Sequence, residues 1–314
     1  MPSLPRWTAD ELPDLSDRVI VVTGANGGLG FATTKALARH GAHVIMACRS
    51  AEKAAEAARR IEDESPAGRV EPWALDLASL RSIEAFAERL TAQHDELYAL
   101  CNNAGVMALP RRVTADGFEM QLGTNHLGHY ALTGRLLPLL LAAEGSRVVT
   151  VTSMMHRMGR IDFDDLQGEH HYRKWAAYSQ SKLANLLFTY ELQRRLSAAK
   201  VETFAVAAHP GYSDTNLQTE AARMTGSVIA GRLMAAATRV AAQSPEMGAL
   251  PSLYALTAED VHGGDFIGPG GLMQMWGYPA KVEPAPVAKD PELASRLWAV
   301  SQQLTGVRYD ALSN

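Results

Sequence analysis

Tyr178 and Lys182 stand four positions apart in the segment YSQSKLANL, so on a helix they share one face. A ketone or aldehyde that accepts hydride develops alkoxide character, and a tyrosine hydroxyl can protonate it if its pKa falls from about 10 toward neutral. A neighbouring ammonium group stabilises the tyrosinate and so lowers that pKa. The pair predicts Tyr178 as an acid/base with Lys182 as its electrostatic partner. A helix with one buried aromatic and one solvated lysine would give the same pattern.

A glycine-rich turn in the segment VVTGANGGLG predicts a phosphate site. Gly24, Gly28 and Gly30 follow an apolar strand that ends at Thr23, and they precede a run compatible with a helix. Glycines allow a tight turn and let a pyrophosphate approach backbone N–H groups at a helix N-terminus, where the helix dipole favours negative charge. An ordinary strand-to-helix turn is the alternative.

The end of the second strand indicates which dinucleotide binds. An acidic residue there would meet the ribose 2′-hydroxyl of NAD, whereas a basic residue accommodates a 2′-phosphate. The chain reads HVIMACRS, so no carboxylate follows the strand but Arg49 does. Because a guanidinium can form bidentate bonds to a phosphate, the sequence predicts NADP(H) in preference to NAD(H). A solvated surface arginine is the alternative.

Further motifs follow in a fixed order. The segment CNNAG ends a strand, TNHLGHYALT contains Asn125, and VVTVTSMMH places Ser153 just past another strand. With the turn T-G-x-x-x-G-x-G and the pair Y-x-x-x-K, they cover about residues 19 to 215, over which the chain resembles the short-chain dehydrogenase/reductase family. The resemblance implies an enzyme that acts on CH–OH and C=O groups with NAD(P), in which Ser153 orients the substrate oxygen. It also implies that Asn125 holds a water linking Lys182 to solvent, and that Lys182 touches the nicotinamide ribose.

The resemblance also implies which residues contact the cofactor. Asp76 and Leu77, in ALDLAS, match an element that flanks the adenine, and the stretch from Pro210 to Thr215 matches one that borders the nicotinamide. Asp76 would serve equally as the cap of a helix that opens at Ser79. The predicted cofactor contacts are Gly24, Asn26, Gly28, Leu29, Gly30, Arg49, Asp76, Leu77, Asn103, Ala104, Gly105, Tyr178, Lys182, Pro210, Gly211 and Thr215.

Ser153 and Tyr178 lie 25 positions apart, wider than the spacing common in the family. The extra segment GRIDFDDLQGEHHYRKW, with NHLGHY, SKLANLLF and ACRS, is similar to the retinol dehydrogenase-like and WW-domain-oxidoreductase-like branch. The leading prediction is hydride transfer between NADP(H) and a carbonyl or alcohol of an apolar small molecule. Two alternatives stay open: a cofactor-binding sensor without catalysis, and a double-bond reductase like the protochlorophyllide reductases, which share part of the pattern.

Apolar β-branched runs alternate with segments of helical period through the first two thirds of the chain, which is typical of a parallel sheet covered on both faces. We expect a Rossmann-type doubly wound α/β fold in a single domain over residues 1–314. The cofactor-binding and catalytic core would occupy about residues 17–211, and a substrate lid with the last strand about residues 212–280. The expected strands are Val19 to Thr23, His43 to Ala47, Val70 to Ala74, Tyr98 to Asn102, Arg147 to Thr152 and Thr203 to Ala208. The expected helices are Leu29 to His40, Ala51 to Glu64, Leu80 to Gln93, Asp116 to Leu141 and Ala176 to Ala199, with another beginning in SPEMGALPSLYAL and a strand and turn in DFIGPGGLMQMWGYP.

The segment from Tyr212 to Ala242 is rich in Ala and Met. Methionine adapts to irregular apolar shapes, so a lid over an apolar substrate is one prediction and a helical core stripe is the other. His156, His170 and His171 lack a partner at metal-ligand spacing. They are expected to border the substrate entrance, and no metal is predicted.

Composition excludes several classes of protein. A net charge of −4 with no long basic run argues against nucleic-acid binding. Cys48 and Cys101 are interpreted as small core residues, which favours a reducing compartment. No apolar run is long enough for a signal sequence or a membrane span. We therefore expect a soluble cytoplasmic protein with a small-molecule substrate, and pairing of its long helices makes a homo-oligomer possible.

Overall fold

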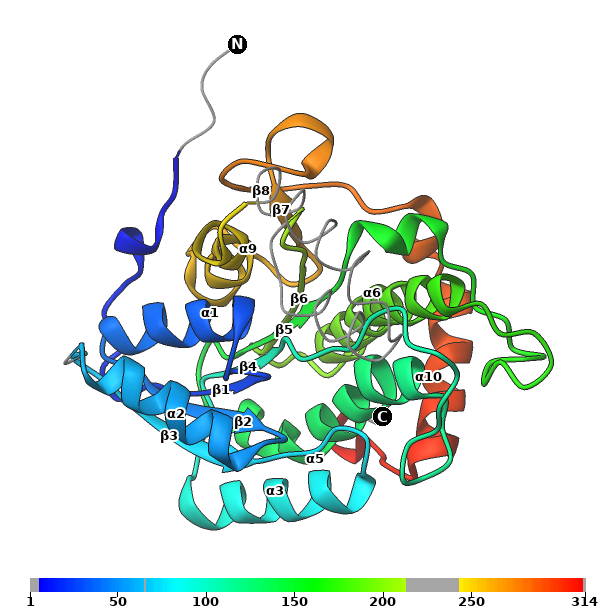
Figure 1. The fold of residues 1–314 in the computed structure, drawn as a ribbon, viewed down its shortest axis with the longest axis horizontal. Helices are drawn as coiled ribbons and strands as arrows, with labels where there is room; N and C mark the ends of the chain where they lie inside the picture. The colour runs from blue at the N-terminus through cyan, green and yellow to red at the C-terminus, as the bar shows by residue number, and fades with distance from the viewer. Residues whose placement is uncertain (1–5, 65, 213–242, 313–314) are drawn as a thin grey trace, which may run out of the picture.

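An eight-stranded sheet runs through the centre of the structure, a computed structural model that describes residues 6–64, 66–212 and 243–312 (Figure 1). The strand order is β3-β2-β1-β4-β5-β6-β7-β8. All neighbours from β3 to β7 pair in parallel, and β8 closes one edge antiparallel to β7. The strands are β1 Val19–Thr23, β2 His43–Cys48, β3 Arg69–Ala74, β4 Ala99–Asn102, β5 Arg147–Val151, β6 Phe204–Ala208, β7 Phe266–Pro269 and β8 Pro279–Lys281.

Helices cover both faces of this sheet. Helices α1, α2 and α9 pack on one face, α3, α5 and α6 on the other, and α10 packs against α6 (Figure 1). The longer helices are α1 Gly28–Arg39, α2 Ala51–Glu62, α3 Leu80–Gln93, α5 Gly128–Ala142, α6 Lys174–Ala198, α9 Pro245–Thr257 and α10 Pro291–Thr305. The short helical turns are η1 Ala9–Glu11, α4 Met120–Leu122, η2 Gly123–Leu127, η3 Met154–Met158, η4 Leu272–Gln274, η5 Pro286–Lys289 and η6 Asp310–Leu312.

The two layers follow from the alternation of side chains along the strands. In β1, Ile20 and Val22 belong to the core cluster under α1 and α9, whereas Val21 belongs to the cluster under α3 and α5. Because successive side chains of a strand point to opposite faces, an unbroken apolar strand needs cover on both. The doubly wound fold predicted from the sequence is confirmed.

The predicted elements agree with the structure except at one helix. Each of the six predicted strands is present, with ends shifted by one residue at most. The helix predicted over Asp116 to Leu141 is wrong at its start, because Thr114 to Gly117 form a turn and the Glu119 side chain accepts the N–H groups of Gln121 and Leu122 to open α4. A turn of π-helix, η2, then separates α4 from α5.

Helix α10 was not predicted from the sequence, although its capping signals are clear. The Asp290 carboxylate accepts the N–H groups of Glu292 and Leu293, Pro291 occupies the first turn, and Gly306 ends the helix at a φ of 68°. Such an Asp-Pro start and glycine stop are standard helix signals. The predicted lid, from Tyr212 to Ala242, lies outside the described residues apart from Tyr212 itself.

Cys48 and Cys101 are buried free thiols, which agrees with their interpretation as core residues. In the described part of the chain, no helix has the length and apolar character needed to cross a membrane. Within the same residues, no three His, Cys, Asp or Glu side chains gather closely enough to hold a metal ion.

Candidate active site

The strand order reverses beside β1, whose neighbours are β2 and β4. Connections from β1 and β4 leave the sheet on opposite faces, and in sheets of this type ligands bind in a crevice at the carboxyl ends of the two strands. The glycine turn follows β1, the segment NNAG continues from β4, and Ser153 comes just after β5. The fold therefore gathers motifs from three strands at one edge of the sheet.

The glycine turn needs glycine for conformation and for space. Gly24 and Gly28 have φ values of 67° and 53°, in the left-handed region that side chains disfavour. A Cβ on Gly30 would lie 2.3 Å from the Gly24 carbonyl oxygen. Helix α1 begins directly after the turn without a side-chain cap, so its first backbone N–H groups point toward the crevice edge without a side-chain acceptor. This arrangement fits a pyrophosphate.

Thr23 joins the glycine turn to the segment after β4. Its Oγ1 accepts the backbone N–H groups of Asn103 and Ala104, each at 2.9 Å. The Asn103 side-chain amide donates to the Thr23 carbonyl at 2.7 Å. These bonds set the two loops side by side, so predicted cofactor contacts from both reach the same crevice.

The structure brings Ser153, Tyr178 and Lys182 together. Ser153 caps η3 and lies near enough to Tyr178 to lower the pKa of its hydroxyl, and the Tyr178 side chain is 5% exposed on α6. The Lys182 Nζ lies 5.8 Å from the centre of the Tyr178 ring and donates to the Val151 carbonyl at 3.1 Å. Tyr178 and Lys182 are thus nearly excluded from solvent at the end of β5, and the partly exposed Ser153 lies beside them.

Burial shifts the pKa of both ionisable groups in this cluster. It raises the pKa of Tyr178 to about 12, while the hydrogen bond from Ser153 acts in the opposite direction. It lowers the pKa of Lys182 to about 8. Burial therefore disfavours the charged form of each group alone. The attraction between a tyrosinate and a neighbouring ammonium group would offset the free-energy cost of burying both charges.

Asn125 lies within the π-turn η2, where backbone irregularity often accompanies a functional site. Its side chain is fully used: Oδ1 accepts the Val106 N–H at 2.7 Å, and Nδ2 donates to the Val106 carbonyl and to Ser181 Oγ, both at 2.9 Å. Gly105 lies against the same group, since a Cβ there would be 3.2 Å from Asn125 Oδ1 and 3.6 Å from Lys182 Nζ. Asn125 therefore fixes the loop after β4 against α6.

His129 is a site-linked residue that sequence reasoning missed. Its Nδ1 lies 3.0 Å from the Asn125 carbonyl, which can only accept, so Nε2 accepts from the Thr23 hydroxyl at 3.0 Å. The ring is buried, and burial lowers its pKa to about 4, which keeps it neutral. Its position four residues after Asn125 on a helix was the available signal.

The residues predicted at the adenine end occupy the same edge of the sheet. Arg49 follows β2 directly and is exposed, and within the described residues it makes no hydrogen bond or ion pair. Asp76 accepts the Ala78 N–H at 3.0 Å, and Leu77 is buried. Ser79 itself caps α3 by accepting the Ser82 N–H, so Asp76 does not cap that helix.

The segment after β6 is described only in part. Gly211 has a φ of 67°, and its N–H donates to His209 Nδ1 at 3.2 Å. A Cβ on Gly211 would lie 2.5 Å from the Met275 carbonyl oxygen, so glycine is needed for this close approach. Pro210 lies beside it at the carboxyl end of β6, whereas Thr215 is outside the described residues.

The prediction that His156 borders the substrate entrance is wrong. Its ring is fully buried, with 0% exposure, because both ring nitrogens bond to backbone groups of the protein interior. His170 and His171 are exposed. His171 lines a cavity of about 460 Å³ formed largely by the segment between Ser153 and Tyr178.

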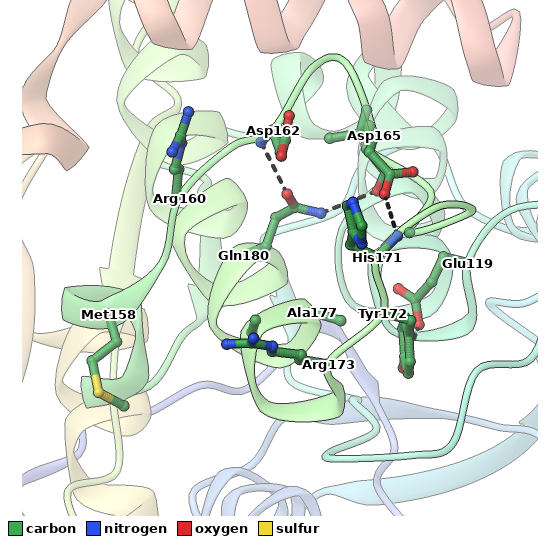
Figure 2. A pocket seen from close by; sticks show the side chains of 13 residues that line it. Glu119, Met158, Arg160, Asp162, Asp165, His171, Tyr172, Arg173, Ala177 and Gln180 are labelled. Atoms are coloured by element: carbon green, nitrogen blue, oxygen red, sulfur yellow. Dashed lines mark hydrogen bonds between the residues drawn. The ribbon is translucent and has the colours of Figure 1, made fainter.

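Figure 2 shows the side chains that line this cavity beside the first turn of α6, with the hydrogen bonds between them. Gln180 accepts the Asp162 N–H at 3.1 Å, and the Asp165 carboxylate accepts the His171 N–H at 2.9 Å. Ala177 lines the cavity and directly precedes Tyr178. Neither Ser153 nor Tyr178 lines the cavity as far as the described residues define it, so the cavity adjoins these two side chains without containing them.

A family model of the short chain dehydrogenases matches residues 18–226, which include the glycine turn, Ser153, Tyr178 and Lys182. The chain belongs to the short-chain dehydrogenase family. It is therefore an oxidoreductase that acts on CH–OH groups, and its family binds NAD(P). The family and enzyme class predicted from the motifs are confirmed.

Within this family the chain is retinol dehydrogenase-like. It is 43% identical over 294 residues to retinol dehydrogenase 13 from Homo sapiens, covering 92% of this chain and 85% of that protein. A crystal structure of an uncharacterised protein from Mycobacterium paratuberculosis is 45% identical, with a TM-score of 0.80 over 97% of this chain and 99% of that one. A structure described as an NAD(P)-dependent gluconate 5-dehydrogenase from Beutenbergia cavernae, with bound NADP at low occupancy, is 30% identical, with a TM-score of 0.60 over 81% of this chain and 95% of that one. These relatives favour neither the sensor nor the double-bond reductase.

Proposed function

We propose that this short-chain dehydrogenase transfers hydride between NADP(H) and the carbonyl or alcohol carbon of an apolar small molecule, with Tyr178 as the acid/base. The observation that supports this most is the cluster at the end of β5. There the buried Tyr178 side chain lies beside Ser153, which lowers the pKa of its hydroxyl, and near the buried Lys182 ammonium. When bound, the nicotinamide supplies or accepts the hydride.

The chain's own residues handle the proton. In the reducing direction Tyr178 donates its hydroxyl proton to the substrate oxygen, while the Ser153 hydroxyl holds that oxygen in place. The resulting tyrosinate is stabilised by Lys182, whose ammonium is anchored on the Val151 carbonyl and cannot move away into solvent. Asn125 orders the loop after β4 through its side chain and would hold the water that returns a proton to Lys182.

The crevice provides a fitting place for the dinucleotide. Gly24, Gly28 and Gly30, with Asn26 and Leu29 between them, would hold the pyrophosphate at the N-terminus of α1. Asp76 and Leu77 would flank the adenine. The segment Asn103, Ala104 and Gly105 would border the ribose next to Lys182, and Pro210, Gly211 and Thr215 the nicotinamide.

Arg49 supports a preference for NADP(H). It is exposed at the end of β2 and, in the described part of the chain, is engaged by no acid, so its guanidinium is available for a 2′-phosphate. The bound NADP of the 30% identical neighbour supports the same preference.

An apolar substrate is supported by the surface next to Tyr178. The Trp175 ring, 47% exposed, stands edge-on to the Tyr178 ring with centroids 6.4 Å apart. Met158, 68% exposed, lies on η3 just beyond Ser153. The names of the retinol dehydrogenase relatives indicate an apolar alcohol or aldehyde as well.

A panel of aldehydes tests this function. NADPH oxidation would be followed with nonanal and all-trans-retinal as apolar probes, with glyceraldehyde as the polar control, and each would be repeated with NADH. We expect turnover of an apolar probe with NADPH and slower turnover with NADH. Binding of NADPH without oxidation by any of the aldehydes would contradict the proposal and favour a sensor.

A further inference from the structure

The ring of His156 lies between the catalytic serine and a segment far along the chain. Its Nδ1 is 2.7 Å from the backbone carbonyl oxygen of Ser153, and its Nε2 is 3.0 Å from the backbone nitrogen of Ala285. The ring is fully buried and packs edge-on against Phe266, with centroids 5.7 Å apart. Every polar atom of this side chain is therefore engaged.

These two partners determine the protonation state of the ring. The Ser153 carbonyl can only accept a hydrogen bond and the Ala285 N–H can only donate one, so Nδ1 carries the proton and Nε2 is a bare acceptor. Burial is the main reason that the pKa of His156 is lowered, and the Arg157 cation beside it on η3 acts the same way. His209, whose ring also packs against Phe266, is likewise held neutral by burial, which lowers its pKa to about 3. A neutral imidazole thus fits both neighbours.

His156 links the turn that carries Ser153 to the helix that carries Tyr178. Ala285 precedes η5, whose Ala288 packs in the same core cluster as Leu183 and Leu187 of α6. Helix α6 also carries Tyr178. Contacts therefore run from Ser153 through the His156 ring and η5 to the helix that carries Tyr178. Through them the ring holds the Ser153 turn in position relative to Tyr178.

We propose that His156 is a positioning residue whose Nδ1–H, bonded to the Ser153 backbone carbonyl, holds the Ser153 hydroxyl in place beside Tyr178. This inference rests on the proposed roles of Ser153 and Tyr178. Without the ring, the Ser153 carbonyl keeps only the bond from the His156 backbone N–H, at 2.9 Å. The serine hydroxyl would then move relative to the substrate oxygen and the tyrosine.

Two substitutions separate the bonds of the ring. His156→Asn places an amide nitrogen near the position of Nδ1 and keeps a donor for Ser153, but it cannot reach Ala285. His156→Gln extends to the position of Nε2 and keeps an acceptor for Ala285, but it loses the donor to Ser153. His43→Asn is the control for loss of a buried histidine, because His43 opens β2 at the opposite end of the sheet and bonds Glu71 and Arg69.

The measurement is kcat, KM and the pH dependence of alcohol oxidation and aldehyde reduction with NADP(H) and nonanal or nonanol, with NADPH affinity by fluorescence titration. We expect His156→Gln to lower kcat by about tenfold or more with NADPH affinity nearly unchanged, while His156→Asn and His43→Asn keep most of the wild-type kcat. The Ser153 bond lowers the pKa of Tyr178. In His156→Gln the limb of oxidation that rises with pH should therefore move to higher pH.

Wild-type kcat in His156→Gln would overturn the inference, and so would equal losses in His156→Gln and His156→Asn without a shift of the pH limb. Either result would leave the proposed function intact if Tyr178→Phe, measured in parallel, is inactive. Full activity of Tyr178→Phe would instead contradict the proposed function, and the inference would fail with it.

Discussion

Lys182 and Arg49 are the two cations that the proposed reaction uses, and they stand in opposite surroundings. Lys182 is 4% exposed and is held on the Val151 carbonyl, whereas Arg49 is exposed beyond β2. A charge that must change the pKa of a neighbour acts most strongly where water is excluded. A charge that must recognise an incoming phosphate has to be accessible and uncommitted. For the proposed reaction, the contrast means that the acid/base group is preformed in the fold, whereas the contact of Arg49 with a 2′-phosphate would form when the cofactor binds.

Removal of the buried cation should have the largest effect. Lys182→Met keeps the shape of the side chain but removes the charge, so the pKa of Tyr178 rises and we expect kcat to fall by about a thousandfold. The pH limb of alcohol oxidation should move to higher pH. Steady-state rates across pH with NADP⁺ and nonanol measure both effects.

The same substitution should not unfold the protein. Burial lowers the pKa of Lys182, so its ammonium costs folding free energy at neutral pH, and Asn185 still donates to the Val151 carbonyl after the change. Thermal unfolding of Lys182→Met at pH 7 should give a Tm at or above that of the wild type. A large drop in Tm would show that the lysine serves the fold and would weaken the catalytic interpretation.

Removal of the exposed cation should affect binding and leave the chemistry in place. Arg49→Ala is expected to weaken NADPH binding by about ten- to a hundredfold, because a charge-assisted bond to phosphate is worth about 1.5–3 kcal/mol. Affinity for NADH, which lacks the 2′-phosphate, should stay the same, and Arg49→Lys should retain part of the NADPH affinity. Fluorescence titration with both cofactors measures this. An equal loss for NADH would mean that Arg49 contacts another part of the cofactor.

Buried histidines should make the folding stability depend on pH, in the same way that burial affects Lys182. Burial lowers the pKa of His126 to about 3, of His129 to about 4 and of His209 to about 3. Below about pH 6.5 these histidines take up a proton in the unfolded chain but stay neutral in the folded chain. Each histidine therefore lowers the free energy of unfolding by about 1.4 kcal/mol per pH unit, until the pH reaches its pKa in the folded state. Urea unfolding from pH 7 to pH 5 should show this slope. His126→Gln should flatten it, and substitution of the exposed His170 should not.

A substitution far from both cations calibrates the smallest effects. Gly306 ends α10 at a φ of 68°, and no heavy atom lies within 4 Å of a Cβ built there. Gly306→Ala should therefore cost about 1 kcal/mol of folding free energy through backbone conformation alone. Kcat with NADPH should stay at the wild-type value. A loss of activity here would show that modest destabilisation alone can mimic the catalytic variants.

The strands and the order of the site motifs could be predicted because each depends on a short contiguous run. Val19 to Thr23, for example, is apolar on both faces and is followed at once by the glycine turn. The start of α4 was mispredicted because the turn before Glu119 interrupts an otherwise helical pattern. The environments of His129 and His156 could not be predicted, since their partners Thr23 and Ala285 lie 106 and 129 positions away in sequence.

The most direct test of the account is Tyr178→Phe, with kcat for an apolar aldehyde and NADPH affinity measured on the same preparation. The substitution removes the proton donor and leaves the ring in its buried place. We predict a fall in kcat of about a hundredfold to ten-thousandfold, with NADPH affinity unchanged. A wild-type kcat in Tyr178→Phe would contradict the central claim that this hydroxyl carries the proton.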